Sequence, residues 1–65
     1  MKLVVNGAER DVEASTVAAA LTALDYGEAK VATALNGEFV PKRLRKETPV
    51  KEGDKLEIVA PRQGG

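Results

Sequence analysis

The chain ends in two glycines, Gly64 and Gly65, and the terminal carboxyl group is the part of the sequence best suited to chemistry. Glycine has no Cβ atom, so a Gly-Gly end is thin and adopts backbone conformations that are closed to other residues. An extended segment from Pro61 to Gly65 reaches roughly 16 Å, at about 3.3 Å per residue. These properties suit a chain end that threads a narrow channel into the active site of another protein.

A terminal carboxyl group has an ordinary pKa of about 3.3–3.7 and is ionised at neutral pH. The anion is a poor electrophile. It becomes reactive when one of its oxygens attacks the α-phosphorus of ATP, which gives an acyl-adenylate that a sulfur or amine nucleophile can open. The sequence contains no glycine-rich phosphate loop, acidic metal cluster or positioned base, so we expect a partner protein to supply the activation.

The composition removes most other catalytic chemistries. The 65 residues include no Cys, His or Trp, which excludes disulfides, thiolate or imidazole metal sites, and Cys or Ser–His nucleophiles. A single domain of this size buries only about 60% of the surface that its unfolded chain exposes, which is too little for a cleft between lobes. We therefore predict that the chain is not an enzyme and that it binds no metal or cofactor itself.

Basic and acidic residues balance at 10 each, whereas a nucleic-acid or membrane-surface binder normally carries a basic excess. The stretch from Met1 to Gly7 turns polar too early for a secretory signal, and no run approaches the ~20 apolar residues of a membrane span. We expect a cytoplasmic monomer that binds neither nucleic acid nor membrane.

Two Asn-Gly pairs predict tight hairpins, because a type I′ turn needs a positive φ at both central residues. Asn6-Gly7 separates a β-type run at 2–5 from a returning strand at 8–13. Asn36-Gly37 separates a run at 31–35 from a short pairing at Phe39-Val40. A third turn at Gly53-Asp54 precedes a last strand at 55–60.

Between the hairpins, the sequence predicts one helix. Ser15 and Thr16 are good N-caps, and Gly27 suits a left-handed C-terminal cap. The apolar positions between them follow the i, i+3, i+4, i+7 spacing of one helical face, and they are Val17, Ala20, Leu21 and Leu24. We expect residues 42–49 to be polar and irregular.

This order of elements predicts an α+β fold of the β-grasp type, a mixed sheet with one main helix packed on one face. The first and last strands then lie side by side and parallel in mid-sheet. We predict a β-grasp domain at 1–60 and a flexible Gly-Gly tail at 61–65. The predicted core consists of Leu3, Val5, Val12, Val17, Leu21, Leu24, Val31, Leu35, Leu56 and Ile58.

Alternation along the strands points Val4, Ala34 and Val59 away from that core. Scattered exposed valines are ordinary, but contiguous apolar area tends to mark a docking site. Because the tail leaves from beside these residues, we predict that the three form a partner-docking patch.

The whole chain resembles the sulfur carrier protein of thiamine biosynthesis, the ThiS family. The resemblance is carried by the hairpins, the helix start, the Gly-Asp turn and the Gly-Gly end. The matching segments are Asn6-Gly7, Ser15-Thr16-Val17, Val31 through Asn36-Gly37-Glu38, Val40-Pro41, Gly53-Asp54 and the final stretch from Leu56 to Gly65.

The resemblance implies a ubiquitin-like carrier. A ubiquitin-activating-type enzyme, using ATP and magnesium, adenylates the carboxylate of Gly65. Sulfur from a cysteine desulfurase route then gives a thiocarboxylate, which donates its sulfur at thiazole synthase. Carried over to this chain, Gly65 is the attachment site, while Gly64, Gln63 and Arg62 form the threading tail.

Three other functions stay open. The chain could be a sulfur carrier like the small subunit of molybdopterin synthase, although those are typically somewhat longer. It could be a ubiquitin-like modifier joined to lysines of other proteins, or an interaction module with an inert tail. The basic run from Lys42 to Lys46 has no counterpart known to us in the family. We interpret it as a solvated face, with an acidic groove on the activating enzyme as the alternative.

Overall fold

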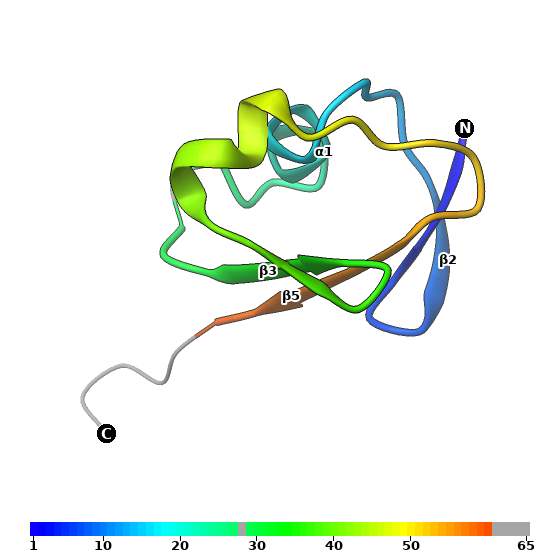
Figure 1. Ribbon diagram of the computed structural model, residues 1–65. Coiled ribbons are helices and arrows are strands. Elements are labelled where there is room, and N and C mark those ends of the chain that lie inside the picture. The colour runs from blue at the N-terminus through cyan, green and yellow to red at the C-terminus, as the bar shows by residue number, and fades with distance from the viewer. Residues whose placement is uncertain (28, 61–65) are drawn as a thin grey trace.

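The computed structural model describes residues 1–27 and 29–60, and within them it shows a mixed sheet covered on one face by helix (Figure 1). The elements are β1 (Lys2–Val5), β2 (Ala8–Asp11), α1 (Val17–Ala23), β3 (Ala32–Leu35), β4 (Glu38–Val40), the 3-10 helix η1 (Lys42–Glu47) and β5 (Lys55–Val59). The predicted fold class, an α+β β-grasp with one main helix, is confirmed.

The strands follow the order β2-β1-β5-β3-β4 across the sheet. The central pair, β1 and β5, is parallel, and the remaining neighbours are antiparallel. The first and last strands are therefore adjacent in mid-sheet, as predicted. Because β5 is central, the strand that leads to the chain end has a hydrogen-bonded neighbour on each side.

Both hairpins turn where the sequence predicts. Asn6 and Gly7 have φ of 51° and 84°, and Asn36 and Gly37 have φ of 51° and 86°. Two successive positive φ values define the type I′ turn, whose twist matches that of the flanking strands. The turn at Gly53, with φ of 85°, is also confirmed.

Helix α1 begins as predicted but ends differently. The Thr16 hydroxyl accepts a hydrogen bond from the Ala19 amide at 3.1 Å. The left-handed residue after the helix is Asp25, with φ of 74°, so the prediction of a cap at Gly27 was wrong. The amide of Tyr26 donates to the Leu21 carbonyl at 2.7 Å. This bond, together with the one from the Asp25 amide to the Thr22 carbonyl at 3.1 Å, forms a Schellman motif.

The position of Tyr26 explains the early stop. A Schellman motif usually brings the second residue beyond the cap against the last turn of the helix. Tyr26 is half-buried against the core that contains Leu21. Burial of this large side chain favours a chain reversal at Asp25, although glycine would adopt the left-handed conformation more easily.

Residues 42–49 are more ordered than the sequence indicates, because η1 occupies most of them. The prediction of an irregular segment was wrong, and so was the interpretation of the whole basic run as a solvated face. Arg45 is 91% buried. Its Nε donates to the Thr33 hydroxyl at 3.2 Å, and its Nη2 donates to the Val31 carbonyl. These bonds attach η1 to the start of β3.

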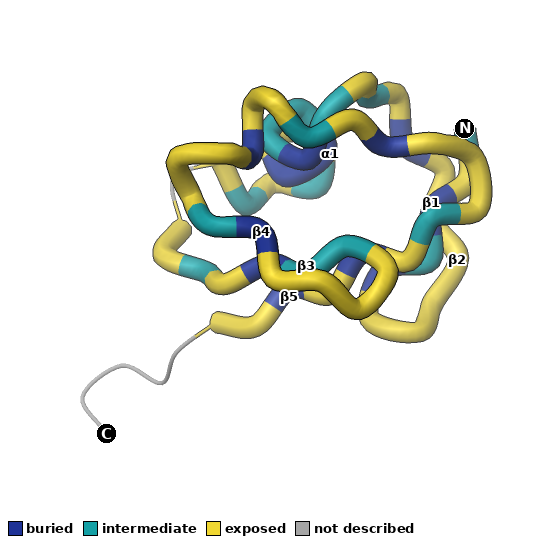
Figure 2. The backbone as a smooth tube through the Cα atoms, in the orientation of Figure 1, coloured by how far each residue is buried: buried dark blue, intermediate teal, exposed yellow. Residues whose placement is uncertain are grey.

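The core lies between the sheet and α1 and is visible as the dark segments of Figure 2. Seven of the ten predicted core residues are buried, and Leu24, Val31 and Leu35 are half-buried against them. The predicted core list omitted Ala20, which was predicted only as part of the apolar helix face, as well as Val40 and Val50 and two buried polar residues, Thr33 and Arg45. The Thr33 hydroxyl donates to the Val40 carbonyl at 2.8 Å, so its burial leaves it satisfied.

The Met1 amine binds both side chains of a small acidic pair. It lies 3.1 Å from a Glu13 carboxylate oxygen and 3.2 Å from one of Asp11. These hydrogen bonds raise the pKa of the amine above its usual value, and the bond to Glu13 contributes most to the shift. No helix in residues 1–27 and 29–60 has the length and hydrophobicity needed to cross a bilayer.

Candidate functional site

The predicted tail residues Arg62, Gln63, Gly64 and Gly65 lie outside the described residues. The part of the site that the structure describes is the end of β5, where the chain leaves the sheet after Val59. Two features determine what this end presents to a partner. One is the set of bonds that hold β5, and the other is the surface beside it.

Asparagine side chains hold both ends of β5. The Asn6 carboxamide binds the backbone of Ile58 twice, accepting from its amide at 2.8 Å and donating to its carbonyl at 3.1 Å. The backbone pairing of β1 with β5 covers only Val4 and Val5, so the Asn6 side chain extends this ladder toward the chain exit. At the other end, Asn36 accepts from the Lys55 amide at 2.9 Å.

The sheet face opposite α1 carries an apolar cluster beside the exit. Strand register sets its composition, because directly opposed residues of antiparallel strands share a face. Ala32 pairs with Val59, and Ala34 pairs with Phe39. The four line one hollow together with Asn6, Thr33 and Glu57, and Glu57 lies opposite Ala34 on β5. We call Ala32, Ala34, Phe39 and Val59 the exit patch.

The exit patch is open to solvent at its two largest members. Phe39 is 70% exposed and Val59 is 63% exposed. Phe39 is one of only two aromatic residues in the chain, and it lines the same hollow as the exposed Val59. Exposed apolar area gathered in this way tends to mark an interaction site. The four side chains of the exit patch are apolar, and Glu57 is the ionisable residue that lines the same hollow.

The structure places the three predicted patch residues differently from one another. Ala34 and Val59 both belong to the exit patch. Val4 also faces away from the core, but it pairs with Lys55 and lines a separate hollow with Gly37. On the outer face of β5, Lys55 and Glu57 precede Val59, so two charged residues separate Val4 from the exit.

Phe39 was missed by the sequence analysis, although a signal for it was present. The Asn36-Gly37 turn is a two-residue hairpin loop, so Leu35 must pair with Glu38 and Ala34 with Phe39. Once Ala34 is predicted to face outward, Phe39 must face outward too. The structure has this register.

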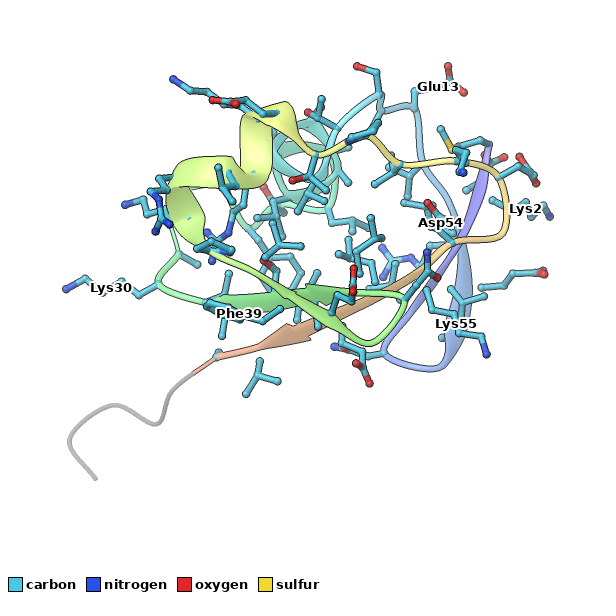
Figure 3. All side chains as sticks on the ribbon, viewed as in Figure 1. Lys2, Glu13, Lys30, Phe39, Asp54 and Lys55 are labelled. Atoms are coloured by element: carbon cyan, nitrogen blue, oxygen red, sulfur yellow. The ribbon has the colours of Figure 1, made fainter. Side chains whose placement is uncertain are left out.

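The described residues contain no group of three or more His, Cys, Asp or Glu side chains placed to hold a metal ion. Figure 3 shows that Phe39 and Lys30 lie toward the end of the sheet where β5 leaves, while Lys2, Asp54 and Lys55 lie toward the other end. The described part of the site is an exposed apolar surface next to the end of β5.

Comparison with known proteins identifies a family, and the similar proteins include the following two. The ThiS family model matches residues 3–65. A crystal structure of a thiamine biosynthesis protein (ThiS) from Geobacter metallireducens aligns over 100% of both chains, with a TM-score of 0.81 and 36% identity. A thiazole synthase of Paramagnetospirillum magneticum is 52% identical over 66 residues, and this chain spans 20% of its length.

The family model begins in β1 and continues to the last glycine, so it includes every element that positions the exit and the Gly-Gly end itself. The structural match extends over the same elements. The resemblance that the sequence indicated is thereby confirmed: the chain belongs to the ThiS family.

Proposed function

We propose that the chain is a sulfur carrier of thiamine biosynthesis whose cargo is attached at the carboxyl group of Gly65. One observation carries the proposal: the ThiS family model extends through Gly64 and Gly65. The Geobacter metallireducens relative, a thiamine biosynthesis protein that aligns over its full length, supports the same pathway.

The proposed chemistry takes place at the chain end and in partner enzymes. A carboxylate oxygen of Gly65 attacks the α-phosphorus of ATP, pyrophosphate leaves, and a glycyl-adenylate forms. Magnesium, held by the enzyme with its ATP, balances the phosphate charge. A persulfide sulfur then attacks the carbonyl carbon and displaces AMP. A thiol cleaves the S–S bond of the resulting acyl disulfide, which leaves the thiocarboxylate on Gly65.

We propose two partner enzymes that act on the chain end, and one source of sulfur. A ubiquitin-activating-type enzyme adenylates the carboxyl group of Gly65, and a thiazole synthase takes the sulfur from the thiocarboxylate. A cysteine desulfurase supplies the sulfur. The Paramagnetospirillum magneticum protein supports the second partner, because a protein named thiazole synthase contains a segment 52% identical to this chain. The small scaffold itself holds and presents the cargo, with no catalytic role.

The exit patch is the proposed docking face for these enzymes. A partner that accepts the tail must cover the surface from which the tail departs, and Val59 is the last residue of β5. Burying an exposed apolar side chain of this size stabilises a complex by about 1.5–3 kcal/mol. Phe39 and Val59 are therefore expected to supply much of the binding free energy.

The carrier chemistry is tested on the intact chain and on a chain lacking Gly65. With ATP, magnesium, the adenylating enzyme and a sulfur source, the intact chain should gain the mass of one oxygen exchanged for sulfur. The shortened chain should show no such gain and should unfold at the same urea concentration. Thiazole formation with the shortened chain would contradict the proposal. In cells, loss of the gene should create a thiazole requirement, whereas loss of molybdoenzyme activity would indicate the molybdopterin branch.

The docking face is tested by Phe39→Ser, with Val4→Ser as the matched control. Val4 lies on the same outer face of the sheet, but it lines a separate hollow beyond Lys55 and Glu57. We expect Phe39→Ser to weaken binding to the adenylating enzyme at least tenfold, since about 1.4 kcal/mol corresponds to a factor of 10. Val4→Ser should change the dissociation constant less than about twofold on the same scale. Equal effects of the two variants would contradict the assignment of the patch.

A further inference from the structure

Positive charge is concentrated in one element of this chain, whose net charge is zero. Residues 42–47 hold four of its 10 basic residues and a single acid, Glu47. The rest of the sequence therefore carries a net negative charge. Such an asymmetry creates a local positive potential although the chain as a whole has a net charge of zero.

The buried Arg45 fixes the position of this charge. Its bonds to Thr33 and to the Val31 carbonyl attach η1 to β3. The ion pairs found within residues 1–27 and 29–60 are those of the Met1 amine, so no carboxylate of these residues neutralises the guanidinium. A charge in such a buried position is screened less by solvent and salt than one at the surface.

Three exposed lysines surround Arg45. Lys42 and Lys46 share one hollow with it, between α1 and η1. Lys42 also lines a second hollow with Arg45 and Lys30, at the start of β3. We call Lys30, Lys42 and Lys46 the basic edge.

The basic edge lies at the end of the sheet from which the chain departs. Val59, the last residue of β5, pairs with Ala32, and Lys30 precedes Ala32 by two residues. Figure 3 shows Lys30 extending from this end, while Lys2 lies at the opposite end. A partner that receives the chain end therefore comes close to Lys30, and it meets Lys42 and Lys46 where it also extends over the α1 side of the sheet.

We propose that the basic edge pairs with an acidic surface of the enzyme that adenylates the chain end, and that it steers the approach of that enzyme. This inference rests on the proposed function and adds a second, charged contact to the apolar exit patch. Charges at the rim of an interface act mainly on the association rate and on its salt dependence. The exit patch then supplies affinity, and the basic edge supplies orientation.

A nucleic acid is the less suitable partner for these lysines. Nucleic-acid binding draws on many phosphate contacts along a basic stripe, whereas the basic edge consists of three lysines around one buried arginine in a chain of zero net charge. An acidic protein surface needs only a few complementary charges to gain in association rate.

The test compares two double charge reversals that change the net charge equally. Lys42→Glu/Lys46→Glu alters the basic edge. Lys2→Glu/Lys51→Glu alters exposed lysines at the far end, where the Gly53 amide donates to the Lys2 carbonyl. Association and dissociation of each full-length chain with the adenylating enzyme are measured at low and at physiological salt. Circular dichroism verifies that each variant folds. If Lys42→Glu/Lys46→Glu does not fold, Lys30→Glu replaces it, because Lys30 lies outside η1.

We expect the reversal at the basic edge to slow association at low salt by about tenfold or more. The dissociation rate should change little, and raising the salt should shrink the difference between variants. The far-end double should associate at nearly the wild-type rate. Equal slowing of association by both double variants would overturn the inference. It would also be overturned if the wild-type chain bound a short fluorescent single-stranded DNA and Lys42→Glu/Lys46→Glu abolished that binding. Failure of the wild-type chain to become adenylated would instead overturn the proposed function, and the steering role with it.

Discussion

The two hydrogen bonds between Asn6 and Ile58 predict that a substitution of Asn6 will loosen the chain exit measurably. In Asn6→Gly the new glycine tolerates the φ of 51° at this turn, so the hairpin should still form. It removes the carboxamide that binds the amide and carbonyl of Ile58. The substitution therefore separates the role of Asn6 in the turn from its role in holding β5.

The expected cost follows from the number of bonds and their surroundings. A typical intramolecular hydrogen bond contributes a net 0.5–1.5 kcal/mol or so, and both bonds are part-buried. The free energy of unfolding should fall by about 1–3 kcal/mol. For a domain of this size, each kcal/mol lowers Tm by about 4–8 °C. Urea denaturation and calorimetry measure the two quantities.

Asn36→Gly is the matched control, because Asn36 has the same φ in the other hairpin. Its bonds, to Asp54 and to the Lys55 amide, are exposed, so its loss should cost less. Amide hydrogen exchange localises each effect. Asn6→Gly should speed exchange at Ile58, and Asn36→Gly should speed it at Lys55. An unchanged Ile58 exchange rate together with unchanged stability in Asn6→Gly would refute the holding role of Asn6.

Three further predictions concern stability. Asp25→Gly should raise the free energy of unfolding by about 0.5–1 kcal/mol, because it places glycine at a left-handed helix end; a drop in the urea midpoint would contradict the described cap. Arg45→Met retains much of the side-chain volume but removes the donors to β3, so it should lower the free energy of unfolding by about 1–3 kcal/mol, again seen in urea. The Glu13 carboxylate raises the pKa of the Met1 amine in the folded chain. The stabilisation that the protonated amine gives the fold should therefore be complete below about pH 8 and lost as pH rises through the raised pKa. A urea midpoint that stays constant from neutral to strongly alkaline pH would exclude this contribution.

Local signals predicted much of the fold because they depend on backbone geometry alone. The two Asn-Gly pairs determined both hairpins, and the alternation of Leu56 and Ile58 gave the buried face of β5. Thr16 determined the helix start through a bond to a residue three positions away. None of these inferences required knowledge of distant contacts.

The missed features depend on contacts between distant residues. Tyr26 moved the helix end to Asp25 because its side chain packs on the core. Arg45 looked like one solvated charge among several, and only the proximity of Thr33 and Val31 makes its burial favourable. Phe39 was predictable in principle, since the register of its hairpin follows from the turn.

The parallel pairing of β1 with β5 has a mechanical consequence. The N-terminal end of β1 and the C-terminal end of β5 lie at opposite ends of the same two strands. A tension applied between the two termini therefore loads the bonds between these strands together, in shear, and does not open them one after another. A force that separates the start of β1 from the end of β5 must therefore break these bonds at the same time.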